Sequence, residues 1–198
     1  MGTRGKFGFF YKGKYYICYN NYDSYPSSLG VHLILELIRA DLDEWIKLLE
    51  NITEVSEDIK PTPEDIEKLE KYTDLTVSDE STEDWYCLLK MTQGSFYRVL
   101  HSGYMENVHD VPKDEEYIYV LDLDEKVFRA QGRYDAFDLT IKLETEELIK
   151  CAIEWSKGGL DEDYDPEKEL VKLQERVKER LIYRKELERR HKGGFREK

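Results

Sequence analysis

The stretch from Tyr19 to Gly30 constrains the fold more than any other, because it joins a predicted hairpin to a predicted buried helix. Pro26 suits the first turn of a helix, since the N–H that proline lacks would be unpaired there. The same proline disfavours helical backbone at Tyr25, which places the boundary between strand and helix. Residues of the types that cap helix N-termini lie on both sides of it: Asp23, Ser24, Ser27 and Ser28.

Short runs rich in Phe, Tyr and Ile predict the strands of a sheet. The first two runs flank Lys12-Gly13, a two-residue connection in which glycine supplies a positive φ. Aromatic residues fall on both sides of the first run, so both faces of the sheet are expected to be covered. Four strands are expected to form an antiparallel sheet, with a short further strand over 137–143: 5–11, 14–19, 117–123 and 126–130.

Apolar residues recur at helical spacing through residues 29–52, which predicts a long helix at the centre of the core. Ala40-Asp41 marks a possible break in it. The sheet is expected to pack against this helix.

Helix start and stop signals place the remaining helices. Thr62 followed by Pro63 predicts a short helix that ends near Tyr72. Ser81 with Asp84 resembles a capping box for the next one. Gly94 interrupts or ends this helix, and Gly103 ends the apolar segment after it. A last helix of the domain is expected over 144–155, and loops over 54–62 and 104–116.

These elements predict a single α+β domain over residues 1–159, followed by a C-terminal arm over 160–198. The arm contains a long amphipathic helix from Asp165 to about His191, with one narrow apolar stripe. Residues 184–198 carry a net charge of +4, which leaves −17 for residues 1–183. We therefore expect the arm to dock on an acidic surface, either its own body or that of a second copy in a homodimer.

The overall charge of −13 argues against direct nucleic-acid binding by the acidic body and leaves the basic C-terminal end open. No apolar run approaches the ~20 residues of a membrane helix, so no membrane association is predicted. The N-terminus leads directly into strand-like sequence without a visible signal peptide, which favours an intracellular location. Three cysteines far apart in sequence are expected to be buried and unbridged: Cys18, Cys87 and Cys151.

Metal and cofactor motifs are not found. The four histidines and three cysteines lack metal-ligand spacing, so neither a metal site nor a cofactor is predicted. Asp122 and Asp124 stand two apart at a strand end, where paired acids can hold a divalent metal. Turn residues that face water are the more common explanation of such a pair.

The polar density of the joint allows two interpretations. It exceeds what capping one helix needs, and a polar cluster at a strand-to-helix turn is a usual position for an anion or substrate. Arg4 and Asp23 could form an ion pair that orders the loop or contacts a charged ligand. The candidate binding residues are Thr3, Arg4, Asn20, Tyr22, Asp23, Ser24 and Tyr25.

The residues Gly2-Thr3-Arg4-Gly5, followed by Asp23-Ser24-Tyr25-Pro26-Ser27 and Leu29-Gly30, resemble an uncharacterised family. That family is associated with marseillevirus-like giant viruses, with phages and with some fungi. Asp84-Trp85-Tyr86 and the run Tyr117 to Asp124 are also similar to its later motifs. The resemblance implies no settled activity.

A weaker resemblance is to N-terminal-nucleophile hydrolases, in which a terminal Cys, Ser or Thr attacks an amide. Removal of Met1 would expose Gly2 here, and glycine has no nucleophilic side chain. The leading hypothesis is therefore a non-enzymatic interaction protein inside the cell. If it is viral, as the first resemblance implies, we expect it in the host cytoplasm or nucleus and as a virion component of a giant virus. The alternative is an amide hydrolase of this kind, or an inactive relic of one.

Overall fold

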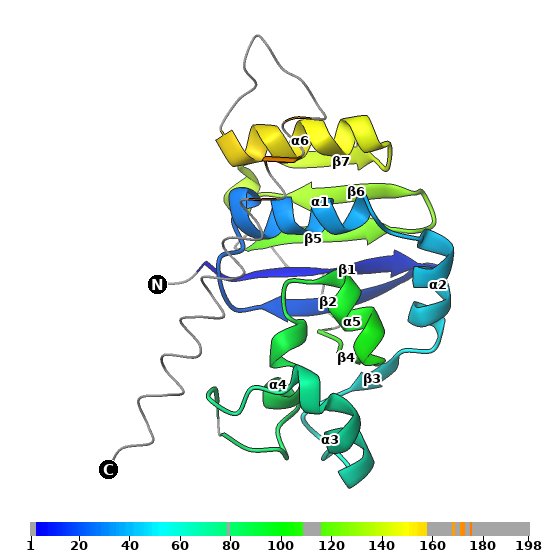
Figure 1. Cartoon of the computed structure of the whole chain (residues 1–198), viewed down its shortest axis with the longest axis vertical. Coiled ribbons are helices and arrows are strands. Elements are labelled where there is room, and N and C mark those ends of the chain that lie inside the picture. Colours follow the sequence, from blue (N-terminus) through cyan, green and yellow to red (C-terminus); the bar gives the residue numbers. More distant parts are fainter. Residues whose placement is uncertain are drawn as a thin grey trace.

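A computed structural model describes residues 3–78, 80–108 and 116–157, together with Lys168, Val171, Lys172 and Glu175. Helices pack on a mixed sheet, which confirms the predicted α+β class (Figure 1). The main sheet has the strand order β2-β1-β5-β6-β7. Its strands are β1 (Gly5–Tyr11), β2 (Lys14–Asn20), β5 (Tyr117–Asp122), β6 (Val127–Gln131) and β7 (Asp138–Lys142).

The prediction of an antiparallel sheet is wrong at its centre. β1 and β5 run parallel, with Gly5 opposite Tyr117 and Phe9 opposite Leu121, whereas the other neighbours are antiparallel. β2 returns the chain to the end of the sheet where β1 starts, since Asn20 and Tyr117 both lie opposite Gly5. Residues 21–116 therefore connect β2 to β5 at one end of the sheet, and β5 enters beside β1 in the same direction. The alternation of apolar residues indicates which face of a strand is buried, but it carries no information on strand direction.

The predicted central helix is divided into shorter elements. A π-helical turn over Pro26–Gly30 leads into α1 (Val31–Leu37), and α2 (Leu42–Glu50) follows after the break predicted near Ala40. Asp41 caps α2, because its side chain accepts hydrogen bonds from the backbone N–H groups of Asp43 and Glu44, both at 3.1 Å. The chain therefore turns at Asp41 and does not continue as one long helix.

One face of the sheet carries the main core. α1, α5 (Phe96–Ser102) and α6 (Thr145–Lys157) lie over this face (Figure 1). Phe96 is at the middle, with its ring centroid 5.0 Å from that of Phe9 and 5.8 Å from that of Phe7. On the opposite face a smaller cluster joins Ile17, Ile118 and Val120. Both faces are thus covered in part, as the aromatic pattern of β1 predicts.

A smaller helical unit lies beyond the β2 edge of the sheet (Figure 1). It contains α3 (Pro63–Leu69), which continues as a 3-10 turn to Tyr72, and α4 (Trp85–Leu88), followed by a 3-10 turn over Lys90–Thr92. A parallel pair of short strands, β3 (Thr53–Val55) and β4 (Tyr104–Glu106), connects it to the rest. These strands lie where loops were predicted, because three residues are too few to show a periodic pattern.

Two predicted caps have different outcomes. Thr62 and Asp65 form the reciprocal capping box of α3, with Thr62 N donating to Asp65 Oδ2 at 2.9 Å. The prediction that Ser81 caps the next helix is wrong. Asp84 caps α4 by accepting from Tyr86 N at 2.8 Å, while Ser81 Oγ accepts from Glu83 N within the preceding turn. Gly94, with a positive φ, separates the 3-10 turn over Lys90–Thr92 from α5, as predicted. Gly103 ends α5 in a left-handed conformation, also as predicted.

The predicted C-terminal arm lies outside the described residues except at four positions, which are helical and exposed. Its docking and the homodimer therefore stay predictions. Among the described residues no helix is long and apolar enough to cross a membrane.

Candidate functional site

The joint between β2 and the first helix is closely packed around Ser24, whose exposed fraction is 0%. Ser24 N donates to Thr3 O at 3.0 Å, and Ser24 O accepts from the Tyr119 hydroxyl at 2.9 Å. Ser24 Oγ accepts from Asn20 Nδ2 at 2.8 Å. A Cβ added at Gly5 would approach Ser24 Cβ to 2.5 Å, so β1 needs glycine at this point of contact. Every polar group of Ser24 thus has a partner inside the fold.

The predicted capping role of the joint is wrong. The π-helical turn starts after Tyr25, which is extended as expected, but no side chain caps that turn. Ser24, which was expected to cap the helix, instead accepts a hydrogen bond from Asn20 through its hydroxyl oxygen. Gly30 lies against the Trp155 ring of α6, so the close approach it permits is that of a side chain, not of another backbone. Ser24, Asn20 and the Tyr119 hydroxyl attach the start of the helix to the sheet.

The seven predicted binding residues divide into two groups. Three of them are buried in the joint: Thr3, Asn20 and Ser24. The other four are exposed: Arg4, Tyr22, Asp23 and Tyr25. The ion pairs among the described residues do not include one between Arg4 and Asp23. Burial raises the pKa values of the Tyr19 and Tyr86 hydroxyls, and the charge of Arg4 offsets only a smaller part of this rise.

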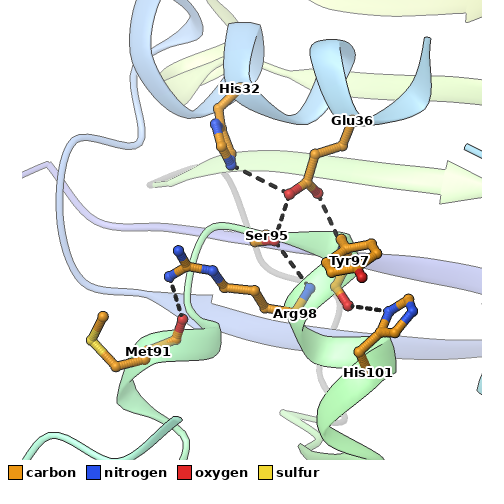
Figure 2. A network of polar contacts seen from close by, with 7 residues as sticks. All are labelled: His32, Glu36, Met91, Ser95, Tyr97, Arg98 and His101. Atoms are coloured by element: carbon orange, nitrogen blue, oxygen red, sulfur yellow. Dashed lines mark hydrogen bonds and ion pairs between the residues drawn. The ribbon is translucent and has the colours of Figure 1, made fainter. Parts of the chain in front are cut away.

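A second polar cluster connects α1 to α5 and is drawn in Figure 2. Glu36 accepts hydrogen bonds from the Ser95 hydroxyl at 2.5 Å and from Tyr97 N at 3.2 Å, and His32 Nε2 lies 3.4 Å from its carboxylate. Ser95 Oγ in turn caps α5 by accepting from Arg98 N at 3.1 Å. We call this group the Glu36 clamp.

The Glu36 clamp contains a serine, a histidine and a carboxylate, but not in a hydrolytic arrangement. A serine nucleophile needs a histidine within hydrogen-bond reach as its base. The described contacts join Ser95 to Glu36 and to Arg98 N, and none joins it to His32. His101 stacks on Tyr97, with ring centroids 3.8 Å apart, and contacts Tyr97 O (Figure 2). The clamp therefore holds the N-terminus of α5 against α1.

A cavity of about 260 Å³ lies where β2 meets the smaller helical unit. β2 contributes Cys18 and Tyr19, α4 contributes Tyr86, and β4 contributes Met105 and Glu106. We call it the tyrosine cavity. Its walls are mostly apolar with a few polar groups, which is the usual composition of a ligand site.

The polar groups of the tyrosine cavity are of opposite kinds. Lys90 Nζ donates to the Tyr86 hydroxyl at 2.8 Å and lies 4.6 and 4.8 Å from the ring centroids of Tyr86 and Tyr22. Glu106 is half-buried, and burial raises the pKa of its carboxyl, with smaller contributions from the negative charges of Glu57 and Asp84. The cavity therefore has a phenolic side next to the Lys90 ammonium group and an acidic side at Glu106.

The three thiols are buried and unbridged, as predicted. Burial raises the pKa of Cys151 to about 12 and raises those of Cys18 and Cys87 as well. A thiol reacts as the thiolate, so these cysteines are inert near neutral pH. They act as small apolar side chains.

The two acids at the end of β5 hold turns in place. Asp122 is 3% exposed and accepts two hydrogen bonds from the Arg129 guanidinium at 3.0 and 3.1 Å. Asp124 accepts from the backbone N–H groups of Lys12 and Gly13 in the hairpin turn. The prediction that both face water is wrong for Asp122. Groups of acidic, histidine or cysteine side chains suited to a metal ion are not found among the described residues.

The tyrosine cavity was not predicted. Its wall residues lie between Cys18 and Val108, on segments that are far apart in sequence and carry no common motif. Tyr19 was noted only as the start of the joint, and Tyr86 only as part of the run Asp84-Trp85-Tyr86, so nothing in the sequence connected the two. Only the packing of the smaller helical unit against β2 brings them together.

Comparison with known proteins gives no relative: no family model, no curated protein and no solved structure matches this chain. The resemblance to an uncharacterised protein family of giant viruses, phages and some fungi, and the weaker one to N-terminal-nucleophile hydrolases, therefore stay predictions.

Proposed function

We propose that this protein is a non-enzymatic interaction protein that binds a basic protein partner at the mouth of the tyrosine cavity. The observation that carries the proposal is the cavity itself, whose wall includes Tyr19 and Tyr86. Lys90 lies between Tyr86 and Tyr22, 4.6 and 4.8 Å from their ring centroids, so Tyr22 is close to this wall. Tyr22 is 45% exposed, although its ring lies beside Lys90 and so is fixed in place. Tyrosines held at a surface are enriched in protein interfaces, because they offer a large contact area with little conformational freedom to lose.

The charge of the chain favours a basic partner. Residues 1–183 carry a net charge of −17. Such a field attracts cationic proteins and repels acidic ones, and it raises the rate of encounter at low salt. The basic C-terminal end of a second copy satisfies the same requirement, so the predicted self-association is one form of this proposal.

The amide-hydrolase alternative has no supporting observation. The two hydroxyl residues nearest the N-terminal strand, Thr3 and Ser24, are 9% and 0% exposed. Ser24 is engaged by Asn20 and by the backbone of Thr3. A virion as the setting rests on the family resemblance alone and stays a prediction.

Site-specific photo-crosslinking tests the proposal. A photoreactive phenylalanine placed at Tyr22 in the full chain is expected to crosslink a protein from extracts of the cells that produce it. The matched control carries the same group at Tyr134, which is 66% exposed and belongs to the turn after β6. A basic protein captured at Tyr22 and not at Tyr134, in amounts that fall with added salt, supports the proposal. Equal capture at both positions, or none at Tyr22, contradicts it.

A further inference from the structure

Glu106 is an acidic side chain for which no partner is found in the part of the chain that the structure describes. Its carboxylate makes no hydrogen bond and no ion pair with any other residue that the structure describes, although neighbouring glutamates such as Glu54 and Glu50 are paired with lysines. The charged groups that act on it are Glu57 and Asp84, which are both acidic. A half-buried carboxylate in such surroundings loses part of its hydration without an ion pair to replace it. A cation from another molecule would supply that ion pair.

Two cations act on the tyrosines of the cavity, Lys90 and Arg4. Lys90 donates to the Tyr86 hydroxyl at 2.8 Å and to Gln93 Oε1 at 3.0 Å. The Arg4 charge acts on Tyr19 and Tyr86, on the phenolic side. Neither comes within ion-pair distance of Glu106 among the described contacts.

The space in front of Glu106 suits an apolar stem that ends in a charge. Leu89, Met105 and Val108 line the cavity together with Glu106. The volume of about 260 Å³ is several times that of a water molecule, which takes about 30 Å³ in the liquid. Lysine side chains bury their methylene stem along apolar surface and keep the ammonium group at a polar end.

We propose that the tyrosine cavity binds the side chain of a lysine of the basic partner, with its methylene stem against Leu89 and Met105 and its ammonium group on the Glu106 carboxylate. The inference deepens the proposed function and rests on it for the source of the lysine. It adds the chemical group that the cavity recognises and the residue that recognises it.

Titration of the full chain with small probes tests the inference. Nα-acetyl-lysine methylamide is expected to bind with a millimolar dissociation constant, seen by NMR as shifts of the Tyr19, Tyr86 and Met105 signals. Nα-acetyl-norleucine methylamide has the same four-carbon stem without the amine. Its dissociation constant is expected to be larger by about tenfold or more. Equal binding of the two probes would overturn the inference, as would no binding of the lysine probe.

Variants identify the carboxylate. Glu106→Gln keeps the shape of the side chain and is expected to weaken the lysine probe by about tenfold or more. Glu57→Gln is the matched control, because it removes a nearby exposed charge outside the cavity wall and is expected to change binding by less than about threefold. Equal effects of the two variants would mean that the general acidic field attracts the probe, and the inference fails. Thermal melting shows whether each variant is folded.

Two further results separate the inference from the proposed function. n-Butylammonium that binds while the lysine methylamide does not would show that the cavity takes a free amine and not a lysine of a protein. Crosslinking at Tyr22 that persists without any binding of the lysine probe would overturn this inference and leave the proposed function standing. Binding of the probe without a crosslinked protein would overturn the proposed function instead.

Discussion

Two neighbouring residues of β2 belong to regions that treat their polar groups in opposite ways. Asn20 belongs to the joint, where the side chains and backbone around Ser24 satisfy one another. Tyr19 belongs to the tyrosine cavity, where Glu106 has no partner among the described residues. The joint has more polar residues in sequence, yet its buried ones, Thr3, Asn20 and Ser24, are all paired within the fold. An unsatisfied group beside a cavity is a stronger reason to propose a binding site than a local abundance of polar residues, and for this reason we place the proposed site at the cavity.

The largest effect is expected in the joint, from Asn20→Ala. Asn20 Nδ2 donates to Tyr22 O and to Ser24 Oγ, so two groups lose their donor when it is removed. Each stranded buried group costs about 1–3 kcal/mol, and we expect the free energy of unfolding to fall by about 3 kcal/mol. For a chain of this length, that lowers the melting temperature by about 6–12 °C.

Asn21→Ala is the control for this prediction. Its side chain takes part in one long contact, 3.4 Å from the Tyr19 hydroxyl, and its loss should cost less than about 0.5 kcal/mol. Calorimetry of both variants measures the difference. Similar melting temperatures for the two would show that Asn20 does not hold the joint together. The contrast between satisfied polar groups in the joint and an unsatisfied one in the cavity would then be wrong.

A somewhat smaller loss is expected from Glu36→Ala in the Glu36 clamp. The carboxylate accepts from the Ser95 hydroxyl and from Tyr97 N, and charged hydrogen bonds contribute about 1.5–3 kcal/mol. We expect a loss of about 2 kcal/mol in urea unfolding, with a partial loss for Glu36→Gln, which keeps one acceptor. Glu67→Ala, on the exposed side of α3, is the control and should change little. An unchanged unfolding midpoint for Glu36→Ala would mean that α5 is held by its apolar contacts alone.

The cavity should respond with the opposite sign, and Glu106→Gln sharpens the comparison. Burial raises the pKa of Glu106 above its ordinary value of 4.5, so the folded protein holds this proton more tightly than the unfolded chain does. Its contribution to stability is therefore lost as the pH rises from below 4.5 through the folded pKa. Glutamine does not titrate. We expect Glu106→Gln to melt at a higher temperature than the parent at pH 7, with the gap closing toward pH 4.

The pH series separates this explanation from others. A variant that gained stability through better packing would keep its advantage at pH 4, since packing does not depend on the proton. A variant that lost stability at pH 7 would show that Glu106 has a stabilising partner in the folded protein, and the contrast between cavity and joint would disappear.

The sequence predicted those features of the fold that local patterns determine. The hairpin of β1 and β2 follows from its aromatic runs and from Lys12-Gly13, and the capping box at Thr62 follows from its spacing. The start of the first helix follows from Pro26, which stands at its first position. In each case the interactions that determine the structure are made within one short segment of the sequence.

Features that depend on distant segments were missed. The parallel pairing of β1 with β5 depends on the path of the 96 residues of the connection 21–116, which no strand pattern records. Ser24 was expected to cap a helix, but its partners Thr3, Asn20 and Tyr119 come from three strands or their ends. Glu106 was one acid among 43 Asp and Glu residues, and only the fold places it in a cavity.

The smallest effect is expected from Asp23→Gly, which tests what the exposed part of the joint contributes. The sequence suggested that Asp23 caps the helix, and loss of such a cap costs about 0.5–2 kcal/mol. In the structure no side chain caps that turn, and Asp23 has a φ of 50°, in the left-handed region that glycine adopts freely. Glycine relieves this strain but gains freedom in the unfolded chain, so the two effects offset each other. We expect the free energy of unfolding to change by less than about 0.5 kcal/mol.

Asp41→Ala is the matched comparison, because Asp41 is also an aspartate that precedes a helix, and it does cap α2 through two backbone hydrogen bonds. Its loss should cost about 1 kcal/mol, which urea unfolding resolves. Glycine is used at position 23 because alanine at φ 50° would add strain of its own and hide the result. If Asp23→Gly lost as much stability as Asp41→Ala, Asp23 would be a helix cap in solution. A small change at Asp23 beside a clear loss at Asp41 would leave its exposed carboxylate without a structural role, although the polar groups around it hold the joint.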